Sequence, residues 1–275
     1  MSFLLGIIYL SFISLGLPDA LLGAAWPNMY PEFQVPVSYA GIISMIIALG
    51  TIISSLKSDR LTRKFGTGKV TAVSVGITAL ALWGFSISHS FILLCLWAIP
   101  YGLGAGSVDA SLNNYVALHY ASKHMSWLHC MWGIGATLGP YIMGAVLSGG
   151  TTWNTGYGII SVLQIVLTAV LIFSLPKWKK QNTLFEETTS EKVLSLKEIL
   201  AIPGAKAIMV CFFCYCAVEQ TTMLWASSYL NLAKGVDAKT AASFAGMFCI
   251  GITIGRGING FIAMKLKDRQ MIRMG

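Results

Sequence analysis

Eight long apolar stretches recur along the 275-residue chain, and they limit its fold more than any other feature. A helix of about 20 apolar residues crosses the hydrocarbon core of a bilayer. Only 11% of the residues are charged, whereas roughly 25% are charged in soluble domains. We predict an all-α, polytopic membrane protein, because the strands of a membrane barrel would be short and alternating. The predicted spans are residues 3–26, 38–56, 70–88, 91–115, 126–148, 155–175, 205–230 and 240–264.

Basic residues gather in every second connection between these spans. One group follows the second span, another follows the sixth, and a third follows the eighth, whereas the opposite connections carry few lysines or arginines. By the positive-inside rule, the amino terminus, the long middle loop and the carboxy terminus are then cytoplasmic. This distribution explains the net charge of +8 without a nucleic-acid partner. We expect a multi-pass protein of the plasma membrane, with its first helix retained because no basic stretch precedes it.

The longest break in hydropathy lies at residues 176–203 and divides the chain. We interpret it as a cytoplasmic linker with a short amphipathic piece at residues 192–200. It would join a six-helix bundle at residues 1–175 to a partial second bundle, helices seven and eight, at residues 204–275. An Asp-Arg pair recurs after the second and eighth spans, which indicates two related halves. Because two six-helix halves need about 400 residues, we expect the chain to lack four helices, which another chain could supply.

Residues 55–64, after the second span, hold an Asp-Arg pair followed by further basic residues. This stretch resembles the loop signature of the major facilitator superfamily, with Ser55 and Thr62 where the signature has glycine. Gly139 and Pro140 lie in a glycine-rich part of the fifth span that resembles the fifth-helix motif of the same superfamily. The resemblance implies a secondary transporter in which two helical bundles enclose a cavity and alternate between conformations.

The motif residues have two physical interpretations each. The loop carboxylate can be held by a neighbouring helix and latch the bundles together, or the basic residues only set topology. The proline loosens the fifth span, but the glycine before it permits close helix packing, so gating and packing explain the pair equally well. The residues concerned are Asp59, Arg60, Arg63, Lys64, Gly139 and Pro140.

Four ionisable residues lie inside otherwise apolar spans: Asp19, Asp109, Glu219 and Arg256. Each costs about 2.5–3.5 kcal/mol at a helix centre, so a polar pathway through the membrane is the simplest reason for them. Asp109 shares a small, polar helix face with Asn113, four residues away. This face resembles the fourth helix of the fucose–proton symporter group, which implies that Asp109 and Asp19 handle a coupled proton. Asp109 replaces the glutamate of that group, which leaves the substrate open.

Burial explains how such carboxyl groups could carry protons. An apolar cavity favours the neutral form of a carboxyl group, and a neutral carrier reorients at lower cost. Pro18 weakens the first helix beside Asp19 and could expose the carboxylate to the cavity. In the structural alternative, Arg256 forms a fixed ion pair with an aspartate or with Glu219.

A polar solute needs neutral hydrogen-bonding groups and aromatic faces in its site. Some of the candidates lie in the first bundle, and others would line the cavity from the second bundle. The candidate substrate-binding residues are Asn113, Asn114, His129, Trp132, Gln164, Glu219, Gln220 and Trp225.

We therefore predict a secondary active transporter that moves a small polar solute, such as a sugar, by proton-coupled symport with alternating access. A proton-driven efflux antiporter for amphipathic compounds and a chain without independent transport activity stay open as alternatives. An intramembrane aspartyl protease is disfavoured, because its glycine-any-glycine-aspartate sequence does not precede Asp109. No phosphate-cradling loop occurs, and the cysteines at 211, 214 and 216 are interpreted as packing residues. We expect no enzyme activity, cofactor or metal.

Overall fold

The computed structural model describes residues 3–185, 196–262, 264–265 and 270. Helices are the regular elements of this part of the chain, which confirms the all-α prediction. The elements are α1 (Phe3–Asp19), α2 (Leu21–Glu32), the 3₁₀ turn η1 (Val37–Tyr39), α3 (Ala40–Phe65), α4 (Thr67–Ser86), α5 (Phe91–His119), α6 (Ser122–Ser148), α7 (Trp153–Phe185), α8 (Leu196–Ala201), α9 (Ala205–Lys234) and α10 (Ala238–Ile262).

In the part of the chain that the structure describes, eight helical units are long and apolar enough to cross a membrane, as predicted. The first unit consists of α1 and α2 together, with a break at Ala20. The prediction that Pro18 weakens this helix agrees with the break, because a proline ring removes one backbone donor. Asp19 is the last residue of α1 and so lies at the break, well inside the first span.

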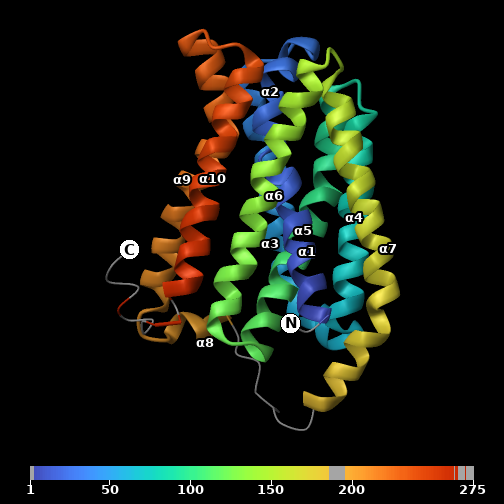
Figure 1. The fold of residues 1–275 in the computed structure, drawn as a ribbon, viewed down its shortest axis with the longest axis vertical. Coiled ribbons are helices and arrows are strands. Elements are labelled where there is room, and N and C mark those ends of the chain that lie inside the picture. Colours follow the sequence, from blue (N-terminus) through green and yellow to red (C-terminus); the bar gives the residue numbers. More distant parts are fainter. Residues whose placement is uncertain (1–2, 186–195, 263, 266–269, 271–275) are drawn as a thin grey trace.

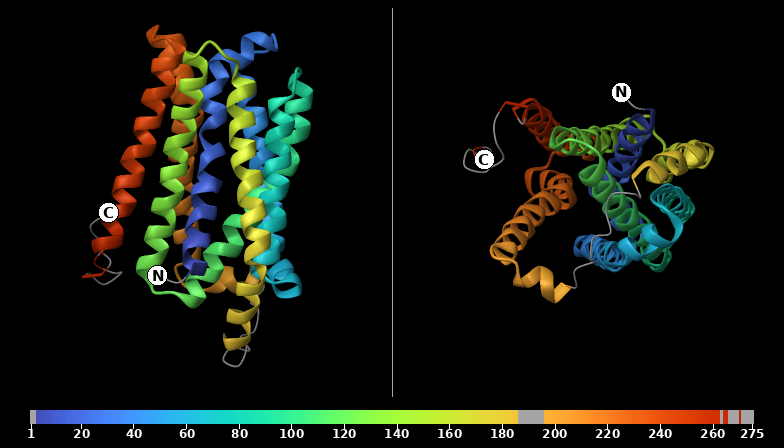
Figure 2. Two further views of the ribbon diagram at one scale, coloured as in Figure 1. Left: turned by 45° about the vertical axis from the view of Figure 1, so that its right-hand side comes forward. Right: turned by 90° about the horizontal axis from the view of Figure 1, so that it is seen from below.

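The helices stand side by side in one elongated bundle, with α1 near its middle (Figure 1). Helix α6 packs along α1 on one side and along α10 on the other, while α4 packs along α5 and α7. The beginning of α1, the end of α7, and α8 all lie at the lower end of the bundle (Figures 1 and 2). This common end agrees with an even number of spans between the amino terminus and the middle loop.

Small residues bring α6 against α1. A Cβ atom added to Gly135 or Gly139 would overlap the backbone carbonyl of Ile13 or Leu17, respectively. Only hydrogen fits at these positions, so the packing interpretation of Gly139 has direct geometric support. Its neighbour Pro140 is buried within α6, which continues unbroken past it.

Helix α7 extends ten residues beyond the predicted end of the sixth span, through Pro176 to Phe185. The buried ring of Trp178 explains the extension, because it lies 5.2 Å from the ring of Tyr115, and its N–H donates to the hydroxyl of Ser174 at 3.1 Å. Helix α8 overlaps the predicted amphipathic piece and ends one residue beyond it, whereas residues 192–195 of that piece lie outside the described part. The second loop signature, at residues 267–269 and 273, lies outside it as well. The division of the chain into two bundles stays a prediction.

A polar network between the helices

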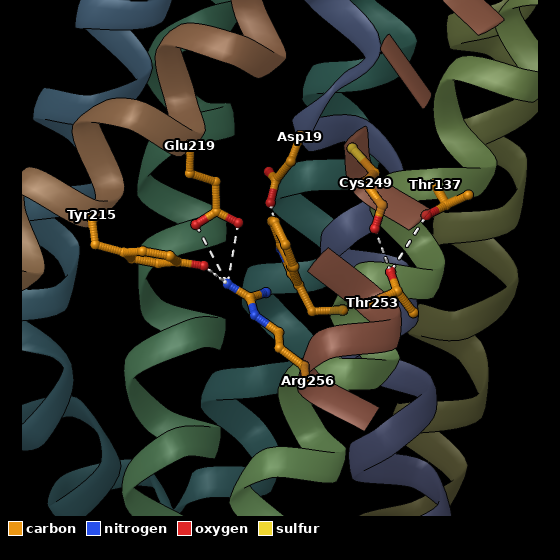
Figure 3. A network of polar contacts seen from close by, with 8 residues as sticks. Asp19, Thr137, Tyr215, Glu219, Cys249, Thr253 and Arg256 are labelled. Carbon is orange, nitrogen blue, oxygen red and sulfur yellow. Dashed lines mark hydrogen bonds and ion pairs between the residues drawn. The ribbon is translucent and has the colours of Figure 1, made fainter. Parts of the chain in front are cut away.

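The carboxylate of Asp19 is held between three helices. The hydroxyl of Tyr101 on α5 donates to its Oδ1 at 3.0 Å, and the indole N–H of Trp132 on α6 donates to its Oδ2 at 2.7 Å. Both partners are neutral, and Asp19 faces the interior of the bundle (Figure 3). The carboxylate therefore faces other helices, and it forms no ion pair with any residue that the structure describes.

These two partners suit both protonation states of a carboxyl group. An indole N–H only donates, whereas a phenolic hydroxyl donates or accepts. If a proton binds Oδ1, the Tyr101 hydroxyl can turn and accept it in a hydrogen bond, while Trp132 keeps its bond to Oδ2. The site can therefore gain or lose a proton without leaving a buried polar group unpaired.

Arg256 on α10 pairs with Glu219 on α9. Its Nη2 lies 3.1 Å from Oε1 of Glu219, and the same nitrogen donates to the hydroxyl of Tyr215 at 2.7 Å (Figure 3). Of the two structural alternatives for Arg256, the structure forms the pair with Glu219, and no hydrogen bond joins Arg256 to Asp19 or Asp109 in the described part of the chain.

Trp132 joins the two halves of this arrangement. Its N–H donates to Asp19, and the guanidinium of Arg256 lies over the face of its ring, 4.6 Å from the ring centre. A cation above an indole face is attracted by the ring quadrupole. A continuous chain of contacts thus runs from α1 through α6 and α10 to α9. We call this set the polar network; its members are Asp19, Tyr101, Trp132, Tyr215, Glu219 and Arg256.

Asp109 and Asn113 share one face of α5, as their spacing predicts. The Asn113 amide donates to Oδ1 of Asp109 at 2.9 Å and to its backbone carbonyl at 3.0 Å. Asp109 is half-buried and lies close enough to Asp19 and Arg256 to interact with their charges, without touching either. The two aspartates therefore belong to one electrostatic environment. Asn114, the next residue along α5, is exposed.

Gln164 departs most clearly from its predicted role in substrate binding. It is 2% exposed, its Nε2 donates to the backbone carbonyl of Ser14 at 2.6 Å, and its Oε1 accepts the Ser14 hydroxyl at 2.6 Å. Pro18, four residues after Ser14, has no N–H for this carbonyl, so the glutamine amide replaces the missing helical bond. Gln164 on α7 thus supplies the hydrogen bond that the Ser14 carbonyl of α1 lacks.

The other second-bundle candidates and His129 are spread along the helices. Gln220 is exposed beside Glu219, whereas Trp225 is partly buried further along α9, packed against the core near α2 and α3. His129 on α6 meets the ring of Phe12 edge-on at 5.8 Å between ring centres. None of Gln220, Trp225 and His129 belongs to the polar network as defined above, whereas the candidate Glu219 does.

Among the described residues, the loop signature forms a local pair and no latch to a neighbouring helix. Asp59 binds Arg63 on its own helix at 3.1 Å, and the two side chains are 44% and 58% exposed. Arg60 and Lys64 are exposed as well, with Lys64 above the ring of Phe65. This geometry fits a solvated helix end that sets topology.

Two tyrosines of the polar network were not among the candidate site residues identified from the sequence. Tyr215 lies four residues before Glu219, on the same helix face, and this spacing could have indicated it. Tyr101 approaches Asp19 across 82 positions of sequence, and no local pattern indicates that contact.

The family model of the Major Facilitator Superfamily matches residues 8–275. The chain belongs to this superfamily. It is 22% identical over 283 residues to the Bypass of stop codon protein 6 of Saccharomyces cerevisiae, covering 94% of this chain and 56% of that protein. It is 21% identical over 256 residues to the Hexuronate transporter of Bacillus subtilis, covering 90% of this chain and 60% of that protein.

The fold is shared with solved transporters. The crystal structure of a D-xylose–proton symporter aligns with a TM-score of 0.65 at 13% identity, covering 90% of this chain and 65% of that one. The likeness shows the fold alone at this identity. The chain spans little more than half the length of the two curated relatives.

Proposed function

We propose that this superfamily member couples proton movement to the transport of a small polar solute, most simply a sugar. The polar network carries the proposal: it places an ionisable carboxyl group, an indole and a charge pair in one chain of contacts across four helices. Its cytoplasmic side would be the end that holds the basic loops, in a plasma membrane.

Asp19 is the proposed proton carrier. Its neutral partners can form hydrogen bonds with both the charged and the neutral carboxyl group, so protonation changes the charge of the polar network without leaving a group unpaired. Asp109 adds a second acid within electrostatic reach, with its geometry fixed by Asn113. Loss of the Asp19 charge changes the field at Arg256, which faces the same indole ring.

Solute selectivity is proposed to lie next to this network. The Hexuronate transporter of Bacillus subtilis, one of the relatives, supports a sugar acid or a related sugar as the solute class. His129 and Gln220, which make no hydrogen bond with the described part of the chain, supply polar groups on the first and second bundles.

The test is uptake by vesicles that contain the reconstituted chain, with labelled D-xylose, D-glucose and D-glucuronate as probes. One proton per solute allows about tenfold accumulation for each pH unit of gradient, acidic outside. Asp19→Asn keeps an acceptor for Trp132 and a donor for Tyr101, so we expect it to lose accumulation while retaining counterflow. Asp109→Asn should behave in the same way.

Glu32→Gln is the matched control, because Glu32 also accepts an indole N–H, that of Trp153 at 2.6 Å, but lies outside the polar network. It should leave accumulation unchanged. Equal loss of accumulation and counterflow in Asp19→Asn, or loss of neither, contradicts the proton role. Extrusion of amphipathic dyes in place of sugar uptake would favour the efflux alternative, and absence of all transport would favour a chain without independent activity.

A further inference from the structure

A cavity of about 480 Å³ lies between α3, α4 and α5, apart from the polar network. Its wall comes from the lower half of α3, the beginning of α4 and the middle of α5. Three kinds of side chain line it: lysines, serines and large apolar residues. The argument rests on Lys57, Lys69, Ser74, Ser107, Val73 and Leu103.

These groups are layered by depth. Lys69 lies in the first turn of α4, near the lower end of the bundle, and Lys57 faces the same cavity from α3. Ser74 lies five residues further along α4 than Lys69, which is about 7.5 Å deeper at 1.5 Å per residue. The apolar wall, with Val73 and Leu103, extends beyond the lysines toward the middle of the membrane.

Three serines line the cavity: the Ser54 hydroxyl donates to the backbone carbonyl of Thr51 at 3.4 Å, whereas the hydroxyls of Ser74 and Ser107 have no partner among the described residues. Ser74 is 6% exposed and Ser107 is 4% exposed, and neither hydroxyl bonds to another residue in the described part of the chain. Both hydroxyls are therefore available at the cavity wall, and a ligand with acceptor atoms at this depth would take a hydrogen bond from each. The two lysines are exposed and likewise form no ion pair with described residues.

We propose that this cavity binds one anionic phospholipid. The phosphate lies between Lys57 and Lys69, the ester carbonyls accept from Ser74 and Ser107, and one acyl chain follows the apolar wall. The order of cation, hydroxyl and hydrocarbon matches the order of groups in such a lipid, and the basic end of the bundle matches the leaflet that is rich in anionic lipids. The site is independent of the transport proposal.

Native mass spectrometry of the chain taken from vesicles of phosphatidylcholine with one fifth phosphatidylglycerol tests the site. Wild type should retain one phosphatidylglycerol after mild removal of detergent, in preference to phosphatidylcholine. Lys57→Gln with Lys69→Gln should lower this preference by about 30-fold. Each lysine near a membrane surface strengthens binding to an anionic lipid by roughly fivefold, and the two factors multiply. Both positions are exposed, so folding is expected to survive.

A charge-matched control is Arg60→Gln with Lys64→Gln, which removes the same charge from the same end of the bundle at positions outside the cavity. It should retain the lipid. Leu103→Trp should reduce retention of the lipid by filling the apolar wall, whereas Leu96→Trp, on the same helix at a 56% exposed position, should not.

Several results would overturn the proposal. Equal retention of phosphatidylcholine, or equal loss in the two double variants, would show that no site for an anionic headgroup exists. Displacement of the lipid by millimolar inorganic phosphate would show that the lysines bind a free anion without the acyl chain.

Discussion

The Glu219–Arg256 pair allows a quantitative test of how charge is held inside the bundle. The guanidinium and carboxylate lie 3.1 Å apart, with side chains only 21% and 8% exposed. The perturbations are Arg256→Gln, Glu219→Gln and both together. Arg256→Gln leaves a buried carboxylate without its cation, which costs about 3–5 kcal/mol in proteins.

Protonation of the orphaned carboxylate sets an upper limit on this cost. The reference pKa of a glutamate side chain is about 4.3, and protonating it costs about 1.36 kcal/mol for each unit by which the pH exceeds that pKa. This cost is about 3.7 kcal/mol at pH 7 and about 1 kcal/mol at pH 5. We therefore expect Arg256→Gln to lose about 3–4 kcal/mol at pH 7 and about 1 kcal/mol at pH 5. The double variant, which buries two neutral amides, should recover about 2 kcal/mol or more of the loss at pH 7.

The assay is unfolding of the detergent-solubilised chain by increasing sodium dodecyl sulfate, followed by circular dichroism at both pH values. The exposed pair of Asp59 and Arg63 supplies the control cycle, with a coupling of about 0–1 kcal/mol. If the coupling of Glu219 and Arg256 is no larger than this, or if the loss in Arg256→Gln is the same at pH 5 and pH 7, the reasoning about the buried pair is wrong.

Three further predictions concern single positions. Trp132→Phe removes the hydrogen bond to Asp19 but keeps an aromatic face, so unfolding in detergent should show a loss of about 1.5–3 kcal/mol. Gly135→Val places a side chain against the backbone of α1 and should cost about 3 kcal/mol or more in the same assay, whereas Gly251→Val, with open space around it, should cost less than about 1 kcal/mol. Hydrogen bonds from the start of α10 hold the pKa of Asp237 below its usual value, so this carboxylate stabilises the helix at neutral pH and loses that effect as the pH falls below about 4; hydrogen exchange at pH 5 and pH 3 should show faster opening at the lower pH.

The spans were predictable because a membrane imposes one length and one composition on every crossing helix. Their ends were less predictable, because local packing decides them. The sixth span continues past Pro176 because the buried ring of Trp178 packs against Tyr115, which lies on another helix. Hydropathy averages cannot contain such a contact.

The candidate site was predictable as a set of residue types but only partly as a set of contacts. Intramembrane charge is costly, and this cost alone indicated Asp19, Glu219 and Arg256. Which partner each acid takes depends on how α6 lies between α1 and α10, a relation that no local sequence period encodes. Gln164 shows the limit clearly: its amide compensates Pro18 from 146 positions away, and the sequence alone suggested solute binding.

The two contacts of Trp132 differ in how they tolerate movement, and this difference indicates where the proposed transporter would separate. A hydrogen bond at 2.7 Å weakens steeply with angle, whereas a cation above a ring face keeps much of its attraction as the cation slides. The hydrogen bond lies between α1 and α6, whose backbones meet at Gly135 and Gly139, where no side chain fits. The ring face meets Arg256 on α10, which belongs to the predicted second bundle. A rocking movement between bundles would therefore keep Asp19 bound to Trp132 and change the position of Arg256, so the charge on Asp19 would bias the movement through the field that it exerts on that cation.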